Sequence, residues 1–298
     1  MSSHATSDEA MTLYTRGERF HRFKEFAAAE EALRAALKVD PSFPPAWDLL
    51  GSVYQAMGQA ERARASFTEA SGKDPAWTVP IEHVGLLEYS LECHKDAVKA
   101  LKKYMKLGGC DQSVLLTLAR AAFEAGDCTT VLSVTSKILA NDEELYEVWE
   151  MRGLCQAMTG RLNAASVSLN MAISLNPDSV EALNKVGDLC YEVANYMRAV
   201  DFYGPSLTKN PGQPRIIFRH GTALWFVGRW SEAIPFLENY TELAPADPKG
   251  WNNLGVVIRE KGLVKRALEC FTKAQRIDPS LEPPRRNMET ATDKQAIP

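Results

Sequence analysis

The sequence lacks the short motifs that mark many enzyme active sites. It contains no G-x-x-x-x-G-K phosphate loop, no G-x-S-x-G nucleophile turn and no H-E-x-x-H metal motif. Its six cysteines show no C-x-x-C spacing and its five histidines are scattered, so no arrangement of zinc ligands is indicated. We therefore expect no catalytic residues, no metal site and no cofactor, and we predict that the chain is not an enzyme.

Long apolar runs and an excess of positive charge are also lacking. Without an 18-residue apolar stretch no membrane span is expected, and the opening MSSHATSDEA does not resemble a secretion signal. Both observations favour a cytoplasmic protein. The 34 basic residues are outnumbered by 38 acidic ones, for a net charge of −4, which gives no general attraction to nucleic acid. Function is thus expected to depend on protein-binding surfaces.

What the sequence does contain is internal repetition with a step of 34 residues. The prolines on this step are Pro41, Pro75, Pro177, Pro211, Pro245 and Pro279. The glycines on it are Gly17, Gly51, Gly85, Gly153, Gly187, Gly221 and Gly255, and the tryptophans are Trp47, Trp149 and Trp251. A fixed period of this length predicts a stack of similar units rather than a globule with one core.

Each 34-residue repeat reads as two amphipathic helices joined by a short turn. The second repeat shows the pattern through Trp47, Leu50, Gly51 and Tyr54, then Ala63, Phe67 and Ala70, all at helical spacing. The small Gly51 and Ala63 would let the two helices approach closely, and Pro75 would end the second helix.

The pattern W-x-x-L-G-x-x-Y, then A-x-x-x-F-x-x-A, then P resembles the tetratricopeptide repeat. The resemblance covers residues 10–281, as eight repeats that start at Ala10, Pro44, Thr78, Gln112, Tyr146, Val180, Pro214 and Pro248. It implies an all-α fold, a right-handed α-solenoid superhelix of stacked helix-turn-helix repeats. We expect residues 1–9 to be a disordered tail and residues 282–298 to form a capping or frayed tail.

Two repeats depart from the pattern. The third ends in Gly109 instead of proline, and the fourth has Val131, Thr135 and Glu143 where alanine, an aromatic residue and proline are expected. Because a solenoid is stabilised by contacts between neighbours, the Gly108–Gly109 pair and the weak fourth repeat are the expected hinge.

In proteins with this repeat, the first helix of each pair lines a concave groove that binds an extended peptide or a partner helix. By this resemblance, the inward charges over the first five repeats are mostly acidic and those over repeats six to eight are mostly basic. Arg215 and Arg219 lie four residues apart on one helix face, a spacing that suits a carboxylate or phosphate. Aromatic residues beside them are typical anchors of binding energy. The predicted partner-binding residues are Asn184, Lys185, Tyr191, Arg215, Phe218, Arg219, Trp225, Phe226, Lys249, Asn252, Asn253 and Arg259.

The resemblance implies an adaptor that holds a protein or peptide partner, with its strongest contacts over repeats six to eight and with an acidic group as one element of the partner. Co-chaperone members of the family hold a terminal carboxylate at such positions, but Glu150 and Leu154 stand here where lysine and asparagine would be needed. Two alternatives stay open. The chain could be a structural scaffold that self-associates as a homo-oligomer or nucleates an assembly, or the regulatory repeat subunit of a separate enzyme.

Overall fold

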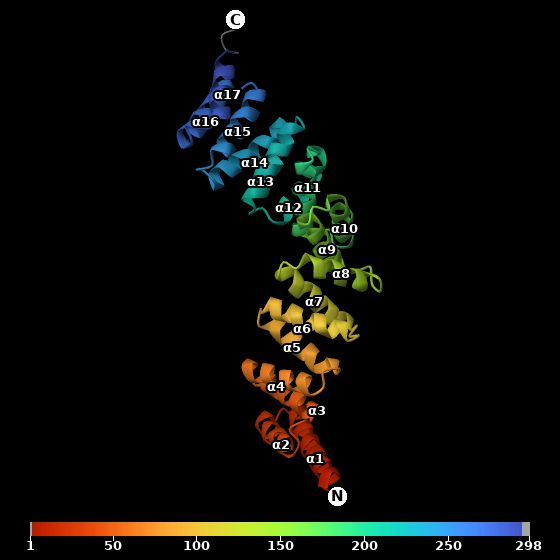
Figure 1. Ribbon diagram of the computed structural model, residues 1–298. Helices are drawn as coiled ribbons and strands as arrows, with labels where there is room; N and C mark the ends of the chain where they lie inside the picture. Colours follow the sequence, from red (N-terminus) through yellow and green to blue (C-terminus); the bar gives the residue numbers. More distant parts are fainter. Residues whose placement is uncertain (1, 294–298) are drawn as a thin grey trace. The chain divides into compact units, whose positions relative to one another are not determined.

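The computed structural model describes residues 2–293, with side chains described over residues 7–288. Within these residues the regular structure is entirely helical (Figure 1). The chain divides between Glu143 and Glu144 into two compact units, which we call the N-terminal body and the C-terminal body. None of the helices in the described part combines the length and the apolar character needed to cross a membrane.

The N-terminal body is built, over its described residues, from consecutive helix pairs. These are α1 (Ser2–Arg22) with α2 (Phe26–Val39), α3 (Pro44–Ala56) with α4 (Ala60–Lys73), α5 (Thr78–Ser90) with α6 (His94–Lys106), and α7 (Gln112–Glu124) with α8 (Cys128–Leu139). Helices α2, α4 and α6 each pack against the first helix of their own pair and against the first helix of the next pair, and α8 packs against α7. The stack is therefore held together by contacts between neighbours, as expected for a repeat array.

The C-terminal body continues the same pattern and adds one more helix. Its pairs are α9 (Tyr146–Met158) with α10 (Leu162–Leu175), α11 (Val180–Glu192) with α12 (Tyr196–Lys209), α13 (Pro214–Phe226) with α14 (Trp230–Leu243), and α15 (Pro248–Glu260) with α16 (Val264–Ile277). The last helix, α17 (Glu282–Asp293), packs against α15 and α16.

From the second pair onward, the first helix of each pair begins at the residue where the sequence places the start of a repeat. Local signals explain several of these starts. Proline occupies the first turn of α3, α13 and α15, where a missing backbone N–H costs nothing. The Asp111 carboxylate accepts hydrogen bonds from the first turn of α7, and the Ser179 hydroxyl does so for α11.

The turn inside every repeat contains one residue in the left-handed backbone region. These residues have φ between 58° and 81° and again follow the 34-residue step: Lys24, Gly58, Glu92, Gly126, Gly160, Ala194, Gly228 and Gly262. Glycine adopts this conformation without steric cost, whereas the three other residues are strained there. The turn is thus one geometry that recurs along the chain, whether or not glycine is present.

The glycine on each first helix lies against a large side chain sixteen residues further on. A Cβ atom built on Gly51 would lie 2.6 Å from the ring of Phe67, and one on Gly255 would lie 2.5 Å from the ring of Phe271. Leucine or tyrosine takes the place of phenylalanine in the other repeats that have this glycine. The close approach of the two helices, inferred above from Gly51 and Ala63, is therefore the central packing contact of the repeat.

Two alanine substitutions within the second repeat are expected to have opposite effects. Gly51→Ala forces a Cβ into the fully buried Phe67 ring, which should cost about 1–3 kcal/mol, partly offset by about 1 kcal/mol of helix propensity. Gly72→Ala, in the last turn of α4 with open space around it, should stabilise the protein by up to about 1 kcal/mol. Urea denaturation followed by circular dichroism measures both, and destabilisation by Gly72→Ala would contradict this account.

The structure differs from the sequence-based expectation at the N-terminus. Helix α1 begins at Ser2, so the segment expected to be a disordered tail is helical from residue 2 onward. This stretch contains neither proline nor glycine, and extending an existing helix costs far less than starting one. At the other end, residues 282–293 form the helix α17, and residues 294–298 lie outside the described part.

The expected hinge comprised the Gly108–Gly109 pair and the weak fourth repeat. The division of the chain falls at the end of the fourth repeat, and the glycine pair lies within the N-terminal body. Gly109 is pressed against the Tyr104 ring, where a Cβ would lie 2.4 Å from the nearest ring atom. The Tyr104 hydroxyl also accepts a hydrogen bond from the Asp111 N–H at 3.3 Å. These contacts fix the glycine pair within the N-terminal body.

Candidate partner-binding site

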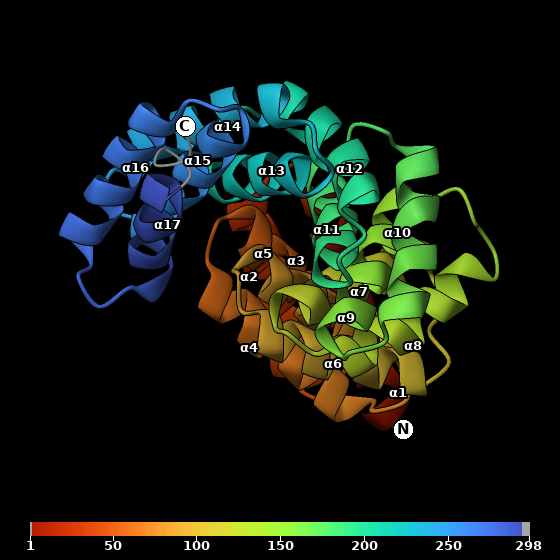
Figure 2. The same cartoon turned by 90° about the horizontal axis from the view of Figure 1, so that it is seen from above.

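The predicted site residues lie on three consecutive first helices of the C-terminal body. Helix α11 carries Asn184, Lys185 and Tyr191, α13 carries Arg215, Phe218, Arg219, Trp225 and Phe226, and α15 carries Lys249, Asn252, Asn253 and Arg259. These first helices contact one another directly and follow the inner side of the curve of this body, with α12, α14 and α16 on its outer side (Figure 2). The predicted residues therefore lie on three neighbouring helices of the inner row.

Arg215 and Arg219 meet on a single carboxylate, that of Asp188. The Nη1 atoms of the two arginines lie 2.7 Å from Oδ2 and Oδ1 of Asp188, respectively. The hydroxyl of Tyr203, a fully buried residue of α12, donates a hydrogen bond to the same Oδ1 at 2.7 Å. Burial, and secondly this bond to Asp188, raise the pKa of Tyr203. The chain itself thus supplies an anion to the two arginines that the sequence assigned to a partner.

Positive charge remains on this surface after Asp188 is counted. Asp188 carries one charge against two arginines, and the Arg215 side chain is still 58% exposed. Lys185 lies on the same helix face as Asp188 and Lys249 is exposed on α15, and neither has an ion-pair partner among the described residues. Glu192, 4.0 Å from Arg219, is the nearby opposing charge. The surface can still bind a carboxylate through Arg215 and the lysines.

The predicted asparagines are engaged within the protein. Asn184 donates to Gln213 at 2.6 Å and accepts from the Ser206 hydroxyl at 2.6 Å. Asn253 donates to Thr222 at 3.3 Å. Asn252 donates to Asn253 at 3.3 Å and accepts from Asn287 of α17 at 3.0 Å. These side chains connect neighbouring helices, so in this structure their amides act as internal links.

An aromatic row follows the ends of α11 and α13, and we define it as Trp225, Phe226, Tyr196 and Tyr191. Trp225 and Phe226 have ring centroids 4.5 Å apart, Phe226 stacks on Tyr196 at 4.2 Å and 11°, and Tyr196 meets Tyr191 edge-on at 5.2 Å. Phe226 is 49% exposed. The row therefore presents a preformed apolar surface to a ligand.

One end of the aromatic row contacts Arg219, which also binds Asp188. The guanidinium of Arg219 lies over the Tyr191 ring at 5.3 Å, a cation–π contact. Tyr196 was missed by the sequence analysis because it lies on a second helix, at the first residue of α12. Phe218, by contrast, packs against Tyr240 of α14, with the ring centroids 4.8 Å apart.

Arg259 pairs with the adjacent Glu260 at 3.3 Å. Over the described residues, no cluster of three or more His, Cys, Asp or Glu side chains is arranged to hold a metal ion. The site thus offers cations, aromatic rings and hydrogen-bond donors, a combination suited to recognition.

Two stretches of the chain match models of the tetratricopeptide repeat, residues 44–76 and residues 218–282. The second stretch contains α14, α15, α16 and most of α13, and it includes the site residues of α15 and those of α13 from Phe218 onward.

The chain is similar to anaphase-promoting complex subunit cut9 of Schizosaccharomyces pombe, with 24% identity over 72% of this chain and 33% of that protein. It spans less than half the length of this and the other leading curated relatives.

Solved structures with the same fold include YrrB, described as a tetratricopeptide repeat protein with an unusual peptide-binding site. That match has a TM-score of 0.55 and 16% identity, over 63% of this chain and 97% of that one. A chain in the structure of Naa15/Naa10 bound to HypK-THB has a TM-score of 0.62 and 16% identity, over 96% of this chain and 46% of that one. At such identities these likenesses concern the fold alone. Residues 44–76 and 218–282 thus match the tetratricopeptide repeat, and the described chain continues their helix pairs on the same 34-residue step.

Proposed function

We propose that the chain is a non-catalytic adaptor whose C-terminal body binds a segment of a partner protein along the inner surface of α11, α13 and α15. The observation that carries this proposal is the aromatic row, which is exposed at Phe226 and ends beside Arg219. Aromatic and arginine side chains supply most of the binding energy in protein interfaces. A row that is already stacked loses little conformational entropy on binding.

The partner segment is proposed to carry an acidic group close to an apolar or aromatic side chain. Arg215 uses its Nη1 atom for Asp188 and its side chain is 58% exposed, so it can bind a carboxylate from the partner. Lys185 and Lys249 add long-range attraction. The peptide-binding site named for YrrB and the complex membership named for cut9 belong to those proteins, and they support a binding role for this chain by analogy of fold.

The aromatic row is tested by Phe226→Ser, with Met158→Ser as the matched control. Met158 occupies the same repeat position as Phe226 two repeats earlier and is 65% exposed, but no aromatic contact is recorded for it. Peptides selected from a random displayed library on the whole protein serve as probes, with binding measured by fluorescence anisotropy. We expect Phe226→Ser to weaken binding about tenfold or more, and Met158→Ser to change it less than about twofold.

Equal binding by both variants and the parent would contradict the placement of the site. Light scattering on the same samples separates an adaptor from a self-associating scaffold. A mass that rises with concentration in the parent and not in Phe226→Ser would assign the row to an interface between copies of the chain.

A further inference from the structure

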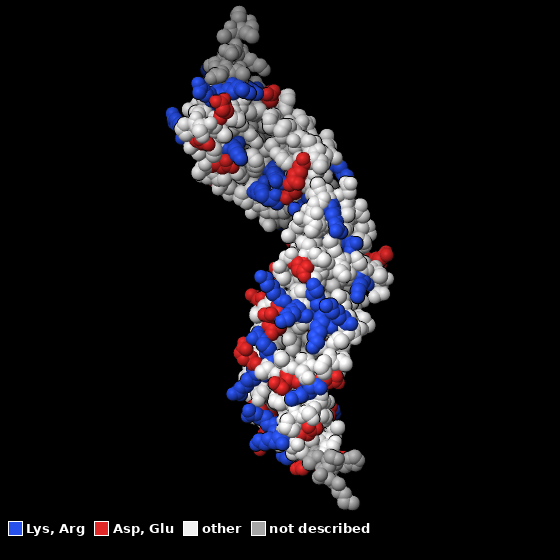
Figure 3. Space-filling model, viewed as in Figure 1, with Lys and Arg blue, Asp and Glu red and all other residues white. Residues whose placement is uncertain are grey.

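Helix α6 of the N-terminal body is strongly basic. Its thirteen residues, HKDAVKALKKYMK, contain Lys95, Lys99, Lys102, Lys103 and Lys106 against the single carboxylate of Asp96. Figure 3 shows Lys and Arg side chains gathered over α6 on this face of the body. As a second helix, α6 is outside the set of first helices to which the groove argument applies.

Most of this charge has no internal partner. Lys102 lies 3.5 Å from the Asp127 carboxylate and donates to the Thr130 hydroxyl at 2.9 Å. The other four lysines are exposed and have neither an ion pair nor a side-chain hydrogen bond within the described residues. Lys95, Lys99 and Lys103 follow one another at intervals of four, so they repel along one helix face. Lys95 also lies in the first helical turn, where positive charge is disfavoured.

Neighbouring carboxylates do not relieve this repulsion. Glu88 of α5, the carboxylate next to α6, is bound by the Arg64 guanidinium at 2.5 Å and 2.9 Å. Glu61 is also bound to Arg64, at 3.0 Å. Arg64 thus accounts for Glu88 and Glu61. Asp96 of α6 carries one negative charge against Lys95, Lys99 and Lys103, so a net positive charge remains on this face.

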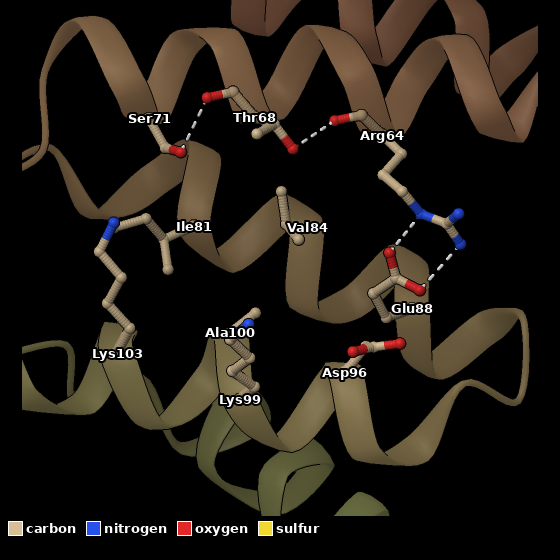
Figure 4. Close-up of a pocket in the computed structure, with 10 residues that line it drawn as sticks. All are labelled: Arg64, Thr68, Ser71, Ile81, Val84, Glu88, Asp96, Lys99, Ala100 and Lys103. Atoms are coloured by element: carbon tan, nitrogen blue, oxygen red, sulfur yellow. Dashed lines mark hydrogen bonds and ion pairs between the residues drawn. The ribbon is translucent and has the colours of Figure 1, made fainter.

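A hollow of about 450 Å³ lies beside these lysines, between α4, α5 and α6 (Figure 4). Its apolar lining comes from Ile81, Val84 and Ala100. Lys99 and Lys103 stand on its α6 side, and Lys103 extends past Ile81 toward Ser71 (Figure 4). Arg64 and Glu88 line it as a pair, and Asp96 adds one negative charge against Lys99 and Lys103. The hollow thus combines an apolar floor with a rim of net positive charge, and its volume is within the range of ligand pockets.

We propose that this surface, formed by Lys95, Lys99 and Lys103 with the hollow over Ile81 and Val84, binds an acidic segment of a partner protein. One apolar side chain of that segment enters the hollow, and flanking Asp or Glu residues pair with the lysines. The argument for this occupant is charge complementarity joined to the apolar floor. A nucleic-acid backbone presents phosphates and would leave the floor uncovered, whereas an acidic peptide with an apolar residue uses both features. The inference concerns a different body from the adaptor site and does not depend on it.

The test uses the full chain and a synthetic peptide of Asp and Glu with one central leucine. The variant is Lys99→Glu with Lys103→Glu, and the matched control is Lys38→Glu with Lys265→Glu, which changes the same charge at exposed lysines on α2 and α16. We expect the α6 variant to weaken binding about tenfold or more and the control less than about twofold. Replacing the leucine of the peptide by serine should weaken binding about fivefold or more.

Several outcomes would overturn the proposal. They are no binding by the parent at about 50 mM salt, equal weakening by variant and control, or no effect of the leucine. Tighter binding of a single-stranded oligonucleotide that is lost in the α6 variant would assign the surface to nucleic acid instead. Circular dichroism checks folding, and Lys99→Gln with Lys103→Gln repeats the test without charge reversal.

Discussion

Replacing Asp188 with alanine is expected to destabilise the C-terminal body by about 2–3 kcal/mol, from the lost hydrogen bonds to a charged group and the unsatisfied buried hydroxyl of Tyr203. Asp188 is 7% exposed and accepts contacts from Arg215, Arg219 and the Tyr203 hydroxyl. Without the carboxylate, the two guanidinium groups repel each other and the buried hydroxyl of Tyr203 has lost its acceptor. The free energy of unfolding, from urea denaturation followed by circular dichroism, measures the effect.

Asp178→Ala is the matched control for this experiment. Asp178 also pairs with a basic residue, Lys209, but its side chain is 76% exposed. Surface pairs of this kind contribute about 0–1 kcal/mol, so the control should remain close to the parent. If Asp188→Ala unfolds at the same urea concentration as Asp178→Ala, Asp188 does not hold α11, α12 and α13 together in the way described.

Acid is expected to weaken the C-terminal body through His220 of α13. His220 is 5% exposed and lies against the Phe236 ring at 4.6 Å, and its Nδ1 atom is buried with no hydrogen-bond partner in the described structure. Burial, reinforced by the positive charge of Arg229 and opposed by Glu232, lowers the pKa of His220 to about 4. The unfolded chain, with a histidine pKa near about 6.5, therefore binds this proton more readily than the folded protein does.

The sign of the pH dependence follows from this difference. The stability contributed by neutral His220 is complete above about pH 6.5 and is lost as the pH falls toward about 4. The full loss is roughly 3 kcal/mol. The free energy of unfolding, measured by urea denaturation, should therefore be lower at about pH 5 than at about pH 7.

His220→Leu should remove that pH dependence, because leucine fills a similar space and takes up no proton. His21→Leu in α1 of the other body is the control and should keep the pH dependence of the parent. Equal pH dependence in the parent and in His220→Leu would show that His220 is solvated more freely than its contacts indicate.

The repetition predicted most of the fold because local signals and spacing agreed. Proline at the start of α3, α13 and α15, and glycine facing Phe67 or Phe271, are read directly from a sequence with a fixed period. The N-terminal extension of α1 carried no such mark. Residues 2–9 precede the first 34-residue repeat, so the prediction for them depended on their polar composition alone.

The candidate site was predicted less completely than the fold. The sequence placed Arg215 and Arg219 on one helix face, but the contact with Asp188 depends on how α11 faces α13 in space. The buried hydroxyl of Tyr203 gave no separate signal, since an aromatic residue at that repeat position is expected from packing alone. The position of Asp188, one repeat before the two arginines and opposite in charge, was the signal that could have revealed the pairing.

The lysines of α6 were visible in the sequence and still overlooked. The resemblance directs attention to first helices, and the inward charges of the early repeats are mostly acidic. Lys95, Lys99 and Lys103 recur every four residues and so lie on one face of α6. This pattern becomes evident only when the charges of the second helices are examined as well.

The recurrence of one left-handed turn at the same place in every repeat has a consequence for how such a chain can change over evolutionary time. Because the turn has the same backbone geometry in each repeat, duplicating or deleting one whole repeat leaves the remaining turns and helix contacts unchanged. An insertion of any other length within a helix pair would rotate the residues that follow away from their neighbours. Arrays of this kind can therefore lengthen by duplication or shorten by deletion of whole repeats, while the turn within each repeat stays the same.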